Sequence, residues 1–450
     1  MDIRLHNTLS RSTETFTPLT PGTVTMYSCG PTVYDTPHIG NYRSFVLNDL
    51  LLRVFEYNDY QVNHVMNITD VDDKTIRKSS EEHLPLTELT RKYEKLFLDG
   101  LESLNILTPH SVVRATEHIG SMIALITTLL EKGVAYKADD GVYMSVAKVK
   151  DYGALAHIDP SAISKERITN DEYDKDSPRD FALWKFHTPA DGDVSWDAPF
   201  GAGRPGWHIE CSAMAMEALG ATIDIHTGGS DLVFPHHTNE IAQSESATGK
   251  QFVRYWVHGG FMTIHDEKMA KSKGNTTKLE DLQREMISPL TYRYWLLTAH
   301  YRSPVNFSFE AIRGAQNALL RLLHTAGNYP QGGAINTSYR ERFLAYINDD
   351  IDTAQAVALM WELIKDASVS DADKRATLLD FDRVFGFSLA TIPTVEDDTS
   401  PIPPEIQALA DARQEARANK DWVKADALRS EIEARGYTLL DTETGFKIVA

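Results

Sequence analysis

Hydrophobic and polar positions in the first 70 residues follow the order strand, loop, helix, strand. Residues 23–28 alternate polar and apolar side chains and predict a strand, residues 42–57 carry apolar side chains at helical spacing, and residues 61–68 predict a second strand. A Gly-Pro loop follows the first strand. This pattern predicts a βαβ unit, whose strand-to-helix loop presents backbone N–H groups to an anion.

The hydrophobic pattern changes along the rest of the chain. Residues 85–132 have helical spacing, whereas residues 136–193 are polar and rich in aspartate, which indicates an insertion rather than part of the sheet. Residues 222–226 form a short apolar strand that ends in glycines. After residue 306 the spacing is helical again. A segment rich in proline and acidic residues, TIPTVEDDTSPIPPE, then leads to a helical tail that ends in a hairpin pattern.

These elements predict an α/β fold. We expect a Rossmann-like parallel-sheet catalytic domain with an insertion, followed by a helical-bundle domain and a small C-terminal α+β domain. The expected boundaries are residues 1–305 for the first domain, with its insertion at about 110–200, then 306–390 for the bundle, 391–404 for a linker and 405–450 for the tail.

Composition narrows the class of protein. A chain of 450 residues with 42% apolar and 24% charged residues is typical of a soluble protein of several domains. The sequence contains no apolar run of about 18 residues and no N-terminal apolar signal region. We therefore expect a cytoplasmic protein that does not bind a membrane. The net charge of -19 argues against a broadly basic surface, so a nucleic acid would have to bind local clusters of Lys and Arg.

The only two cysteines, Cys29 and Cys211, are candidate metal ligands. One pair so far apart in a large chain without secretory features fits free or metal-bound thiols better than a disulfide. A lone cysteine is more often a small buried hydrophobe, so the neighbouring residues decide the interpretation.

The stretch FPHHTNE offers the remaining donors. Pro235 suits the first turn of a helix, and the residues after it have a helical pattern. His236 and Glu240 then share one helical face at i and i+4, while His237 and Glu240 compete at i and i+3. Two thiolates, one imidazole and one carboxylate would complete a zinc site, and spacing leaves the choice of histidine open.

Two further motifs indicate nucleotide chemistry. In PTVYDTPHIGN, His38 and Gly40 stand where a loop turns into a helix, and a helix N-terminus binds the phosphates of ATP readily. In EKMAKSKGN, Lys268, Lys271 and Lys273 form a cationic cluster that suits charge developing in phosphoryl or nucleotidyl transfer. Each motif alone is weak, because a capping histidine and a solvated lysine loop are both common.

In combination, HIGN and KMAKS resemble the HIGH and KMSKS signatures of class I aminoacyl-tRNA synthetases. The segments YSCGPTVYD, NITDVDDK, GAGRPGWHIECSAM and DIHTGGSDLVFPHHTNEIAQSE resemble the cysteinyl-tRNA synthetase family within that class. The resemblance covers most of the chain and is strongest in residues 27–74 and 201–307. Two positions depart from the signatures, since Asn41 replaces the last His of HIGH and Ala270 the first Ser of KMSKS. We expect both to affect the rate more than the function.

The resemblance implies an ATP-dependent ligase that activates L-cysteine as cysteinyl-adenylate and transfers it to tRNA-Cys. It implies one Zn2+ per chain and Mg2+ with ATP, and it selects His236 over His237, so that the metal ligands are Cys29, Cys211, His236 and Glu240. By the same motifs, the ATP-binding and catalytic residues are His38, Gly40, Asn41, Lys268 and Lys271. The residues expected to bind cysteine are Gly30, Thr69, Trp207, His226 and Asp231. We expect the enzyme to act as a monomer.

In the tail, cations at spacings of four, three and four would share one face of a continuous helix and contact tRNA, with a tryptophan close by for stacking. The residues concerned are Arg413, Arg417, Lys420, Trp422 and Lys424. A solvated face is the plain alternative, because acidic residues are interleaved and the segment ANKD could break the helix.

Two other functions fit parts of the sequence. A cysteine:amino-sugar ligase of the mycothiol pathway resembles the same catalytic half, but a small acceptor needs no extra helices and no 50-residue tail. A non-catalytic zinc-binding or RNA-binding relative would be expected to lack His38 or the lysines of residues 268–273, and this chain has them.

Overall fold

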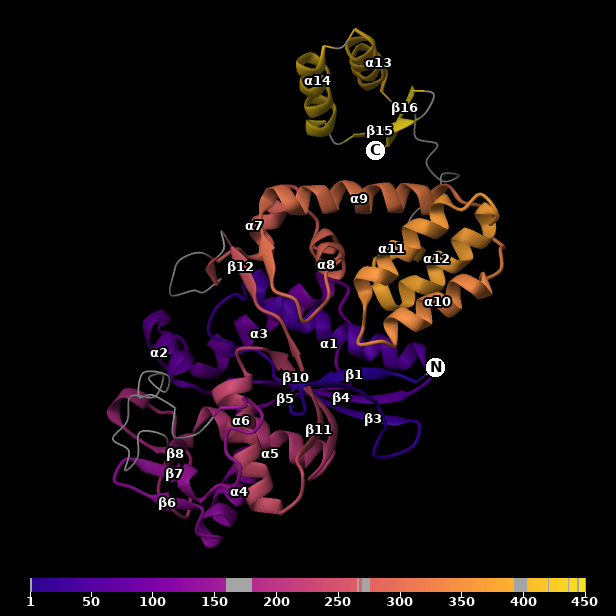
Figure 1. The fold of residues 1–450 in the computed structure, drawn as a ribbon. Helices are drawn as coiled ribbons and strands as arrows, with labels where there is room; N and C mark the ends of the chain where they lie inside the picture. Colours follow the sequence, from indigo (N-terminus) through magenta and orange to yellow (C-terminus); the bar gives the residue numbers. More distant parts are fainter. Residues whose placement is uncertain are drawn as a thin grey trace. The chain divides into compact units, whose positions relative to one another are not determined.

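The computed structural model describes residues 2–158, 180–264, 267–268, 276–391, 403–419, 421–435, 437–442 and 445–449. The chain divides into two compact units, Met1–Thr391 and Ile392–Ala450, which are described separately (Figure 1). Among the described residues no helix is long and apolar enough to cross a membrane.

A five-stranded parallel sheet forms the centre of the first unit. Its strand order is β11 (Val253–Gly259), β10 (Ile223–Gly229), β3 (Thr23–Ser28), β4 (Gln61–Ile68) and β5 (Ser111–Arg114). The chain leaves β3 toward β4 on one side and later returns to β10 on the other. The carboxyl ends of β3 and β10 therefore form a topological switch point, where open α/β sheets bind ligands. The α/β fold and the strands predicted at residues 23–28 and 61–68 are confirmed.

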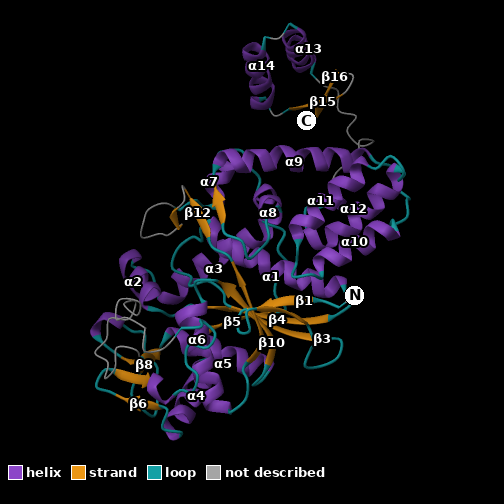
Figure 2. Cartoon of the chain, viewed as in Figure 1, coloured by secondary structure: helices purple, strands orange, loops and turns teal. Residues whose placement is uncertain are grey.

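Helices cover both faces of this sheet (Figures 1 and 2). Helices α1 and α3 lie on one side, and α4, α5 and α6 lie on the other. Their bounds are α1 (Ile39–Tyr57), α2 (Asp73–Glu82), α3 (Leu86–Ser103), α4 (Ile119–Glu131), α5 (Trp207–Leu219) and α6 (Thr238–Thr248). The first helix begins at residue 39, three residues earlier than predicted, because His38 takes an extended conformation and Asn41 completes a capping box with it.

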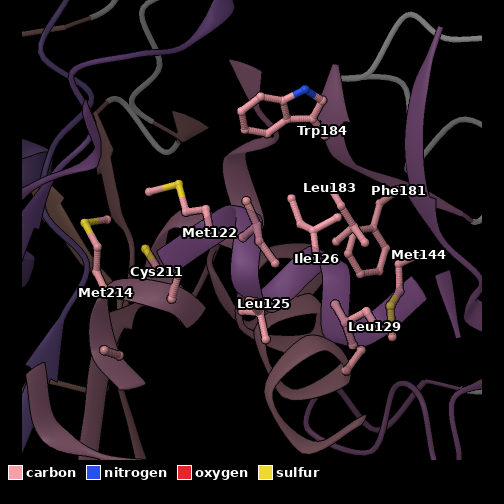
Figure 3. Close-up of a cluster of buried hydrophobic side chains, with 14 of the residues drawn as sticks. Met122, Leu125, Ile126, Leu129, Met144, Phe181, Leu183, Trp184, Cys211 and Met214 are labelled. Carbon is pink, nitrogen blue, oxygen red and sulfur yellow. The ribbon is translucent and has the colours of Figure 1, made fainter. Parts of the chain in front are cut away.

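The predicted insertion forms a separate antiparallel sheet. Its order is β6 (Ala135–Lys137), β7 (Gly141–Met144), β8 (Phe181–Phe186) and β9 (Gly203–Pro205). Aliphatic side chains of α4 pack against this sheet and against α5 (Figure 3). Ile126 and Leu129 of α4 lie beside Phe181 of β8, and Leu125 and Cys211 belong to the same buried cluster. This packing fixes α5 beside the switch point.

After the central sheet the chain forms a smaller sheet and a run of helices. The order of the smaller sheet is β13 (Glu267–Lys268), β12 (Met262–Ile264) and β14 (Val305–Phe307), and helices α7 (Leu279–Arg284) and α8 (Pro289–Leu297) connect its strands. The predicted helical region then contains α9 (Phe309–Asn328), α10 (Thr337–Ile347), α11 (Thr353–Lys365) and α12 (Asp371–Phe385). Each of these four helices starts after a residue whose side chain accepts a hydrogen bond from a first-turn N–H, as helix N-caps do. At the other end of the chain, β1 (Arg4–Asn7) and β2 (Ser12–Thr15) form a hairpin.

The second unit contains two helices and a hairpin. Its elements are α13 (Pro404–Ala418), α14 (Trp422–Ala434), β15 (Thr438–Thr442) and β16 (Gly445–Val449). The predicted hairpin is therefore confirmed. Of the two alternatives at ANKD, the structure shows the break: α13 ends at Ala418, and the Asp421 carboxylate accepts the N–H of Lys424 at 3.1 Å, which starts a new helix.

Candidate metal centre and active site

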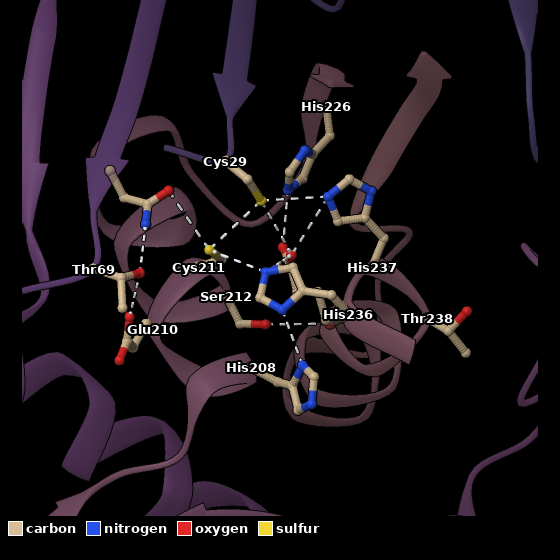
Figure 4. Close-up of polar contacts among 12 residues, drawn as sticks. Cys29, Thr69, His208, Glu210, Cys211, Ser212, His226, His236, His237 and Thr238 are labelled. Carbon is tan, nitrogen blue, oxygen red and sulfur yellow. Dashed lines mark hydrogen bonds and ion pairs between the residues drawn. The ribbon is translucent and has the colours of Figure 1, made fainter. Parts of the chain in front are cut away.

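Four potential metal ligands meet at the carboxyl end of β3. Cys29 directly follows this strand, Cys211 lies in the second turn of α5, and Glu240 lies in the first turn of α6. His236 belongs to the short turn that precedes α6. Figure 4 shows the cysteine and histidine side chains pointing toward one place. Cys211, His236 and Glu240 are almost fully buried.

The distances between these atoms fit a tetrahedral metal. Cys29 Sγ lies 3.7 Å from Cys211 Sγ and 3.8 Å from Glu240 Oε1. His236 Nε2 lies 3.4 Å from Cys211 Sγ and 3.1 Å from Glu240 Oε1. Zinc with Zn–S bonds of about 2.3 Å and Zn–N bonds of about 2.0 Å holds its tetrahedral ligands roughly 3.3–3.8 Å apart. The arrangement therefore fits zinc.

A second set of donors overlaps the first. Cys29, His226, His237 and Glu240 also bring one donor atom each within 4.8 Å of one another. His237 Nε2 lies 3.3 Å from Cys29 Sγ but 3.9 Å from Glu240 Oε1. Only the first set contains both thiols, and thiolates are the stronger zinc ligands. The donor types of the first set, which contains His236, therefore suit zinc better than those of the second, which contains His237.

The turn that carries the histidines differs from the prediction. Pro235 does not begin α6, which starts at Thr238, and Phe234 is extended with φ -139 and ψ 130. The residue before a proline is disfavoured in helical conformation, which explains the break. His236 and Glu240 nevertheless come together, as their spacing predicted.

Further histidines orient the ligands. The Nδ1 atom of His236 lies 3.0 Å from Nδ1 of His208, and Nδ1 of His237 lies 2.8 Å from Nε2 of His258. His226 Nε2 lies 2.9 Å from the second carboxylate oxygen of Glu240. Such contacts fix the rotation of a ligand and leave the opposite atom for the metal.

The electrostatics of the centre favour a cation. A hydrogen bond from Cys29, with His236 also nearby, lowers the pKa of Cys211 to about 6 although burial opposes this. Burial alone would raise the pKa of Glu240, but His226 and His236 hold it at about 2. Burial alone would lower the pKa of His236, and the two negative groups instead raise it to about 10. Cys211 and Glu240 therefore form a buried negative pair that attracts a proton and would equally attract a metal ion.

A network of polar contacts at Gly30 and Thr69 borders the metal centre, where Cys211 Sγ lies 3.7 Å from Asn67 Oδ1. The N–H of Gly30 donates to Asn67 Oδ1 at 2.9 Å, and a Cβ at Gly30 would lie 1.6 Å from the Asn67 carbonyl oxygen. Only glycine fits this approach. Asn67 Nδ2 donates to Thr69 Oγ1 at 3.3 Å, and the Thr69 hydroxyl donates to Glu210 at 2.9 Å. The sequence analysis missed Asn67 and Glu210. Asn67 lies in β4, two residues before Thr69, which follows that strand.

The other residues predicted to bind cysteine lie around the same centre. The Trp207 ring lies 4.2 Å from the His236 ring between centroids. His226 is fully buried and stacks on Trp256 at 4.8 Å. Asp231 follows β10, and its Oδ1 lies 2.5 Å from the position that a Cβ on Gly229 would take. The structure therefore places Trp207 and His226 at the metal centre and Asp231 at the adjacent end of β10.

Comparison with known proteins identifies the family. Residues 15–317 match the model of tRNA synthetases class I (C) catalytic domain, and residues 399–446 match that of the cysteinyl-tRNA ligase anticodon binding domain. The chain is 42% identical to a cysteine-tRNA ligase 1 from Burkholderia lata over 100% of this chain and 97% of that protein. It is 41% identical to a cysteine-tRNA ligase from Methanosarcina mazei, over 99% of this chain and 98% of that protein.

The chain belongs to the cysteine-tRNA ligase family. It is an enzyme that ligates cysteine to tRNA, as the sequence predicted, and the amino-sugar alternative is not favoured because the tail matches an anticodon-binding domain. A solved methionyl-tRNA synthetase from Mycobacterium tuberculosis has the same fold, with a TM-score of 0.56 and 17% identity over 90% of this chain and 96% of that one.

Three of the predicted ATP-binding residues, His38, Gly40 and Asn41, lie at the N-terminus of α1. His38 is the N-cap, and its N–H donates to Asn41 Oδ1 at 3.1 Å. Gly40 lies in the first turn, which contains no acidic residue, so the positive end of the helix dipole is not neutralised there. Lys268 ends β13, while Ala270, Lys271 and Lys273 lie outside the described residues.

The tail residues predicted to bind tRNA do not share one helical face, because α13 and α14 are separate helices. Arg413 is 4% exposed, so its side chain lies inside the unit and not on its surface. Trp422 is 58% exposed, Lys424 is exposed, Arg417 is half-buried, and Lys420 lies outside the described residues.

Proposed function

We propose that the ligase selects cysteine through zinc held by Cys29, Cys211, His236 and Glu240. The observation that supports this proposal is the set of ligand separations, which are close to the edges of a zinc tetrahedron, beside the polar contacts of Gly30 and Thr69. Zinc bound there would supply a position that takes a thiolate and binds the neutral hydroxyl of serine poorly.

This centre addresses the main difficulty of the reaction. Cysteine and serine differ by one atom in the side chain, and the shape of a pocket discriminates such pairs weakly. The carboxylate of Glu240 is unusual in purely structural zinc sites and suits a site that exchanges a ligand. With selection made at the metal centre, the enzyme needs no editing domain.

The residues predicted to bind cysteine would orient the amino acid for activation. We assign Gly30, Thr69, Trp207, His226 and Asp231 to the cysteine-binding site. In activation the carboxylate of cysteine attacks the α-phosphorus of ATP, and pyrophosphate leaves with its electron pair. We assign His38, Gly40 and Asn41 at the start of α1 to the ATP phosphates, with Mg2+ as their counter-ion.

Lys268 and Lys271 act on the same step. They stabilise the negative charge that develops on the phosphates in the transition state, which accelerates the reaction more than binding of the ground state would. A terminal ribose hydroxyl of tRNA then attacks the activated carbonyl, and AMP leaves. We propose that residues 405–450 hold the anticodon during this step.

Cysteine-dependent pyrophosphate exchange tests the first half of the proposal. Purified protein with one zinc per chain should exchange pyrophosphate into ATP with cysteine and far more slowly with serine. Protein treated with a chelator should lose this preference along with the zinc. Retention of the cysteine preference in zinc-free protein would contradict selection by the metal.

A further inference from the structure

A buried arginine lies in the second turn of α1, close to the proposed ATP site. Arg43 is 7% exposed, and within the described part of the chain its guanidinium donates to backbone carbonyls alone. Nη1 lies 2.6 Å from the oxygen of Phe261, and Nη2 lies 3.0 Å from that of Tyr301 and 2.5 Å from that of Ser303. One side chain of α1 thus contacts two segments that are more than 200 positions away in the sequence.

Arg43 is not part of an ion pair. No carboxylate among the described residues contacts its guanidinium, and burial lowers its pKa from the usual value. A buried cation without an acidic partner costs free energy, and here the carbonyl dipoles and the neighbouring Tyr292 offset part of that cost. For stability alone, an apolar side chain of similar size would serve as well. The role of Arg43 therefore depends on which segments these three carbonyls belong to.

The carbonyls belong to the base of the sheet that carries the lysine motif. Phe261 lies between the end of β11 and the start of β12, and β12 leads into the segment of Lys268 and Lys271. Tyr301 and Ser303 precede β14, which pairs with β12. Arg43 therefore connects both paired strands to the helix that starts at His38.

The other end of the lysine segment also contacts the start of α1. The N–H of Ile39 donates to the Thr277 carbonyl at 2.8 Å, and Lys278 forms a β-bridge with His38. In addition, the hydroxyl of Tyr292 in α8 donates to the Ile39 carbonyl at 2.7 Å. The residues before and after the lysine segment are thus both hydrogen-bonded to the first two turns of α1.

We propose that Arg43 is a positioning residue for cysteine activation, which holds the strand leading to the lysine motif in register with the ATP-binding start of α1. This proposal rests on the proposed roles of α1 and the lysines. Because the reacting groups must lie within a fraction of an ångström of their productive positions, a small displacement of β12 lowers the activation rate by on the order of 100-fold. Arg43 does not touch substrate in this account.

The test compares Arg43→Met with a matched buried arginine. Arg375 of α12 is 6% exposed and also donates to backbone carbonyls, those of Ala326 at 2.5 Å and Tyr329 at 3.4 Å. Arg375→Met removes the same type of contact outside the proposed active site. We expect Arg43→Met to lower kcat of pyrophosphate exchange by about 10- to 100-fold with KM for cysteine and zinc content unchanged, while Arg375→Met changes kcat less than about threefold.

A double-mutant cycle with Lys271→Ala separates positioning from a general loss of structure. If Arg43 acts through the lysine motif, Arg43→Met costs several-fold less in the Lys271→Ala background than in the wild type. An equal loss in both backgrounds, or equal kcat losses in Arg43→Met and Arg375→Met, would overturn the proposal. If Arg43→Met does not fold, Arg43→Lys serves in the same cycle, because lysine keeps the charge and one donor. No effect of Lys271→Ala alone would instead contradict the proposed role of the lysines.

Discussion

The metal centre and the C-terminal unit differ in how their functional side chains are held. Cys211, His236 and Glu240 are buried. His236 Nε2 lies 3.4 Å from the sulfur of Cys211 and 3.1 Å from a carboxylate oxygen of Glu240. In the tail, Trp422 and Lys424 lie on the surface of a small unit whose described core contains Ile406, Ala410, Ile432 and Ile448. The first region would be organised before a metal binds, whereas a partner would have to order the exposed groups of the second.

This difference has an electrostatic cause. Charges inside a protein interact strongly, so a buried negative pair such as Cys211 and Glu240 requires a specific compensating cation. Charges on a surface are screened by water and salt within about 8–10 Å, so exposed tail cations contribute through their number and their counter-ions. We therefore expect large effects from single substitutions at the metal centre and small ones in the tail.

The largest effect is expected at the thiol ligands. Cys211→Ser should lower zinc affinity by more than about 100-fold, because thiolates dominate the affinity, and Cys29→Ser should do the same. Glu240→Gln should weaken zinc binding less. Metal analysis after dialysis, with thermal unfolding as the control for folding, measures this. Full zinc retention in Cys211→Ser would contradict the proposal that Cys211 is a zinc ligand.

The lysine motif should give the next largest effect. Lys271→Ala is expected to lower kcat of pyrophosphate exchange by about 100- to 1000-fold with a small change in KM for ATP, since its charge acts where negative charge develops. Lys268→Ala should follow the same pattern. If KM for ATP rose as much as kcat fell, Lys271 would be an anchor for ground-state ATP instead.

Removal of the tail should impair the transfer of cysteine to tRNA and leave the activation of cysteine intact. Deletion of residues 401–450 should leave pyrophosphate exchange within about twofold of the full chain, because both donor sets and α1 lie in the other unit. Aminoacylation should fall through a higher KM for tRNA and depend less on salt. Lost pyrophosphate exchange would show that the tail stabilises the catalytic unit, and unchanged tRNA affinity would exclude it from RNA binding.

The smallest effects are expected from single tail residues. Trp422→Ala should weaken tRNA binding by about 1–3 kcal/mol if the ring stacks on a base. Lys424→Ala should reduce the salt dependence of binding by roughly one phosphate contact. Arg413→Met is the matched control, since Arg413 is buried and its loss should lower the thermal stability of the tail rather than the salt dependence. An effect on salt dependence alone would place Arg413 on the RNA-binding surface.

The same difference limits what the sequence predicts. Cys29 and Gly30 were predictable because they follow a strand, and strand ends meet at one sheet edge. The choice between His236 and His237 came from the family resemblance, since both reach Glu240 and the structure brings both to the centre. Asn67, Glu210 and Arg43 were missed because their contacts join distant segments. In the tail, the sequence left open whether ANKD ends a helix, and local capping by Asp421 decided it.

The coordination of the bound zinc tests the central claim most directly. X-ray absorption at the zinc edge separates sulfur ligands at about 2.3 Å from nitrogen and oxygen ligands at about 2.0 Å. The set of Cys29, Cys211, His236 and Glu240 predicts two sulfur atoms without substrate and one more when cysteine binds. A single sulfur without substrate would mean that zinc occupies the overlapping set of Cys29, His226, His237 and Glu240, and an unchanged sulfur count with cysteine would contradict selection through the thiolate.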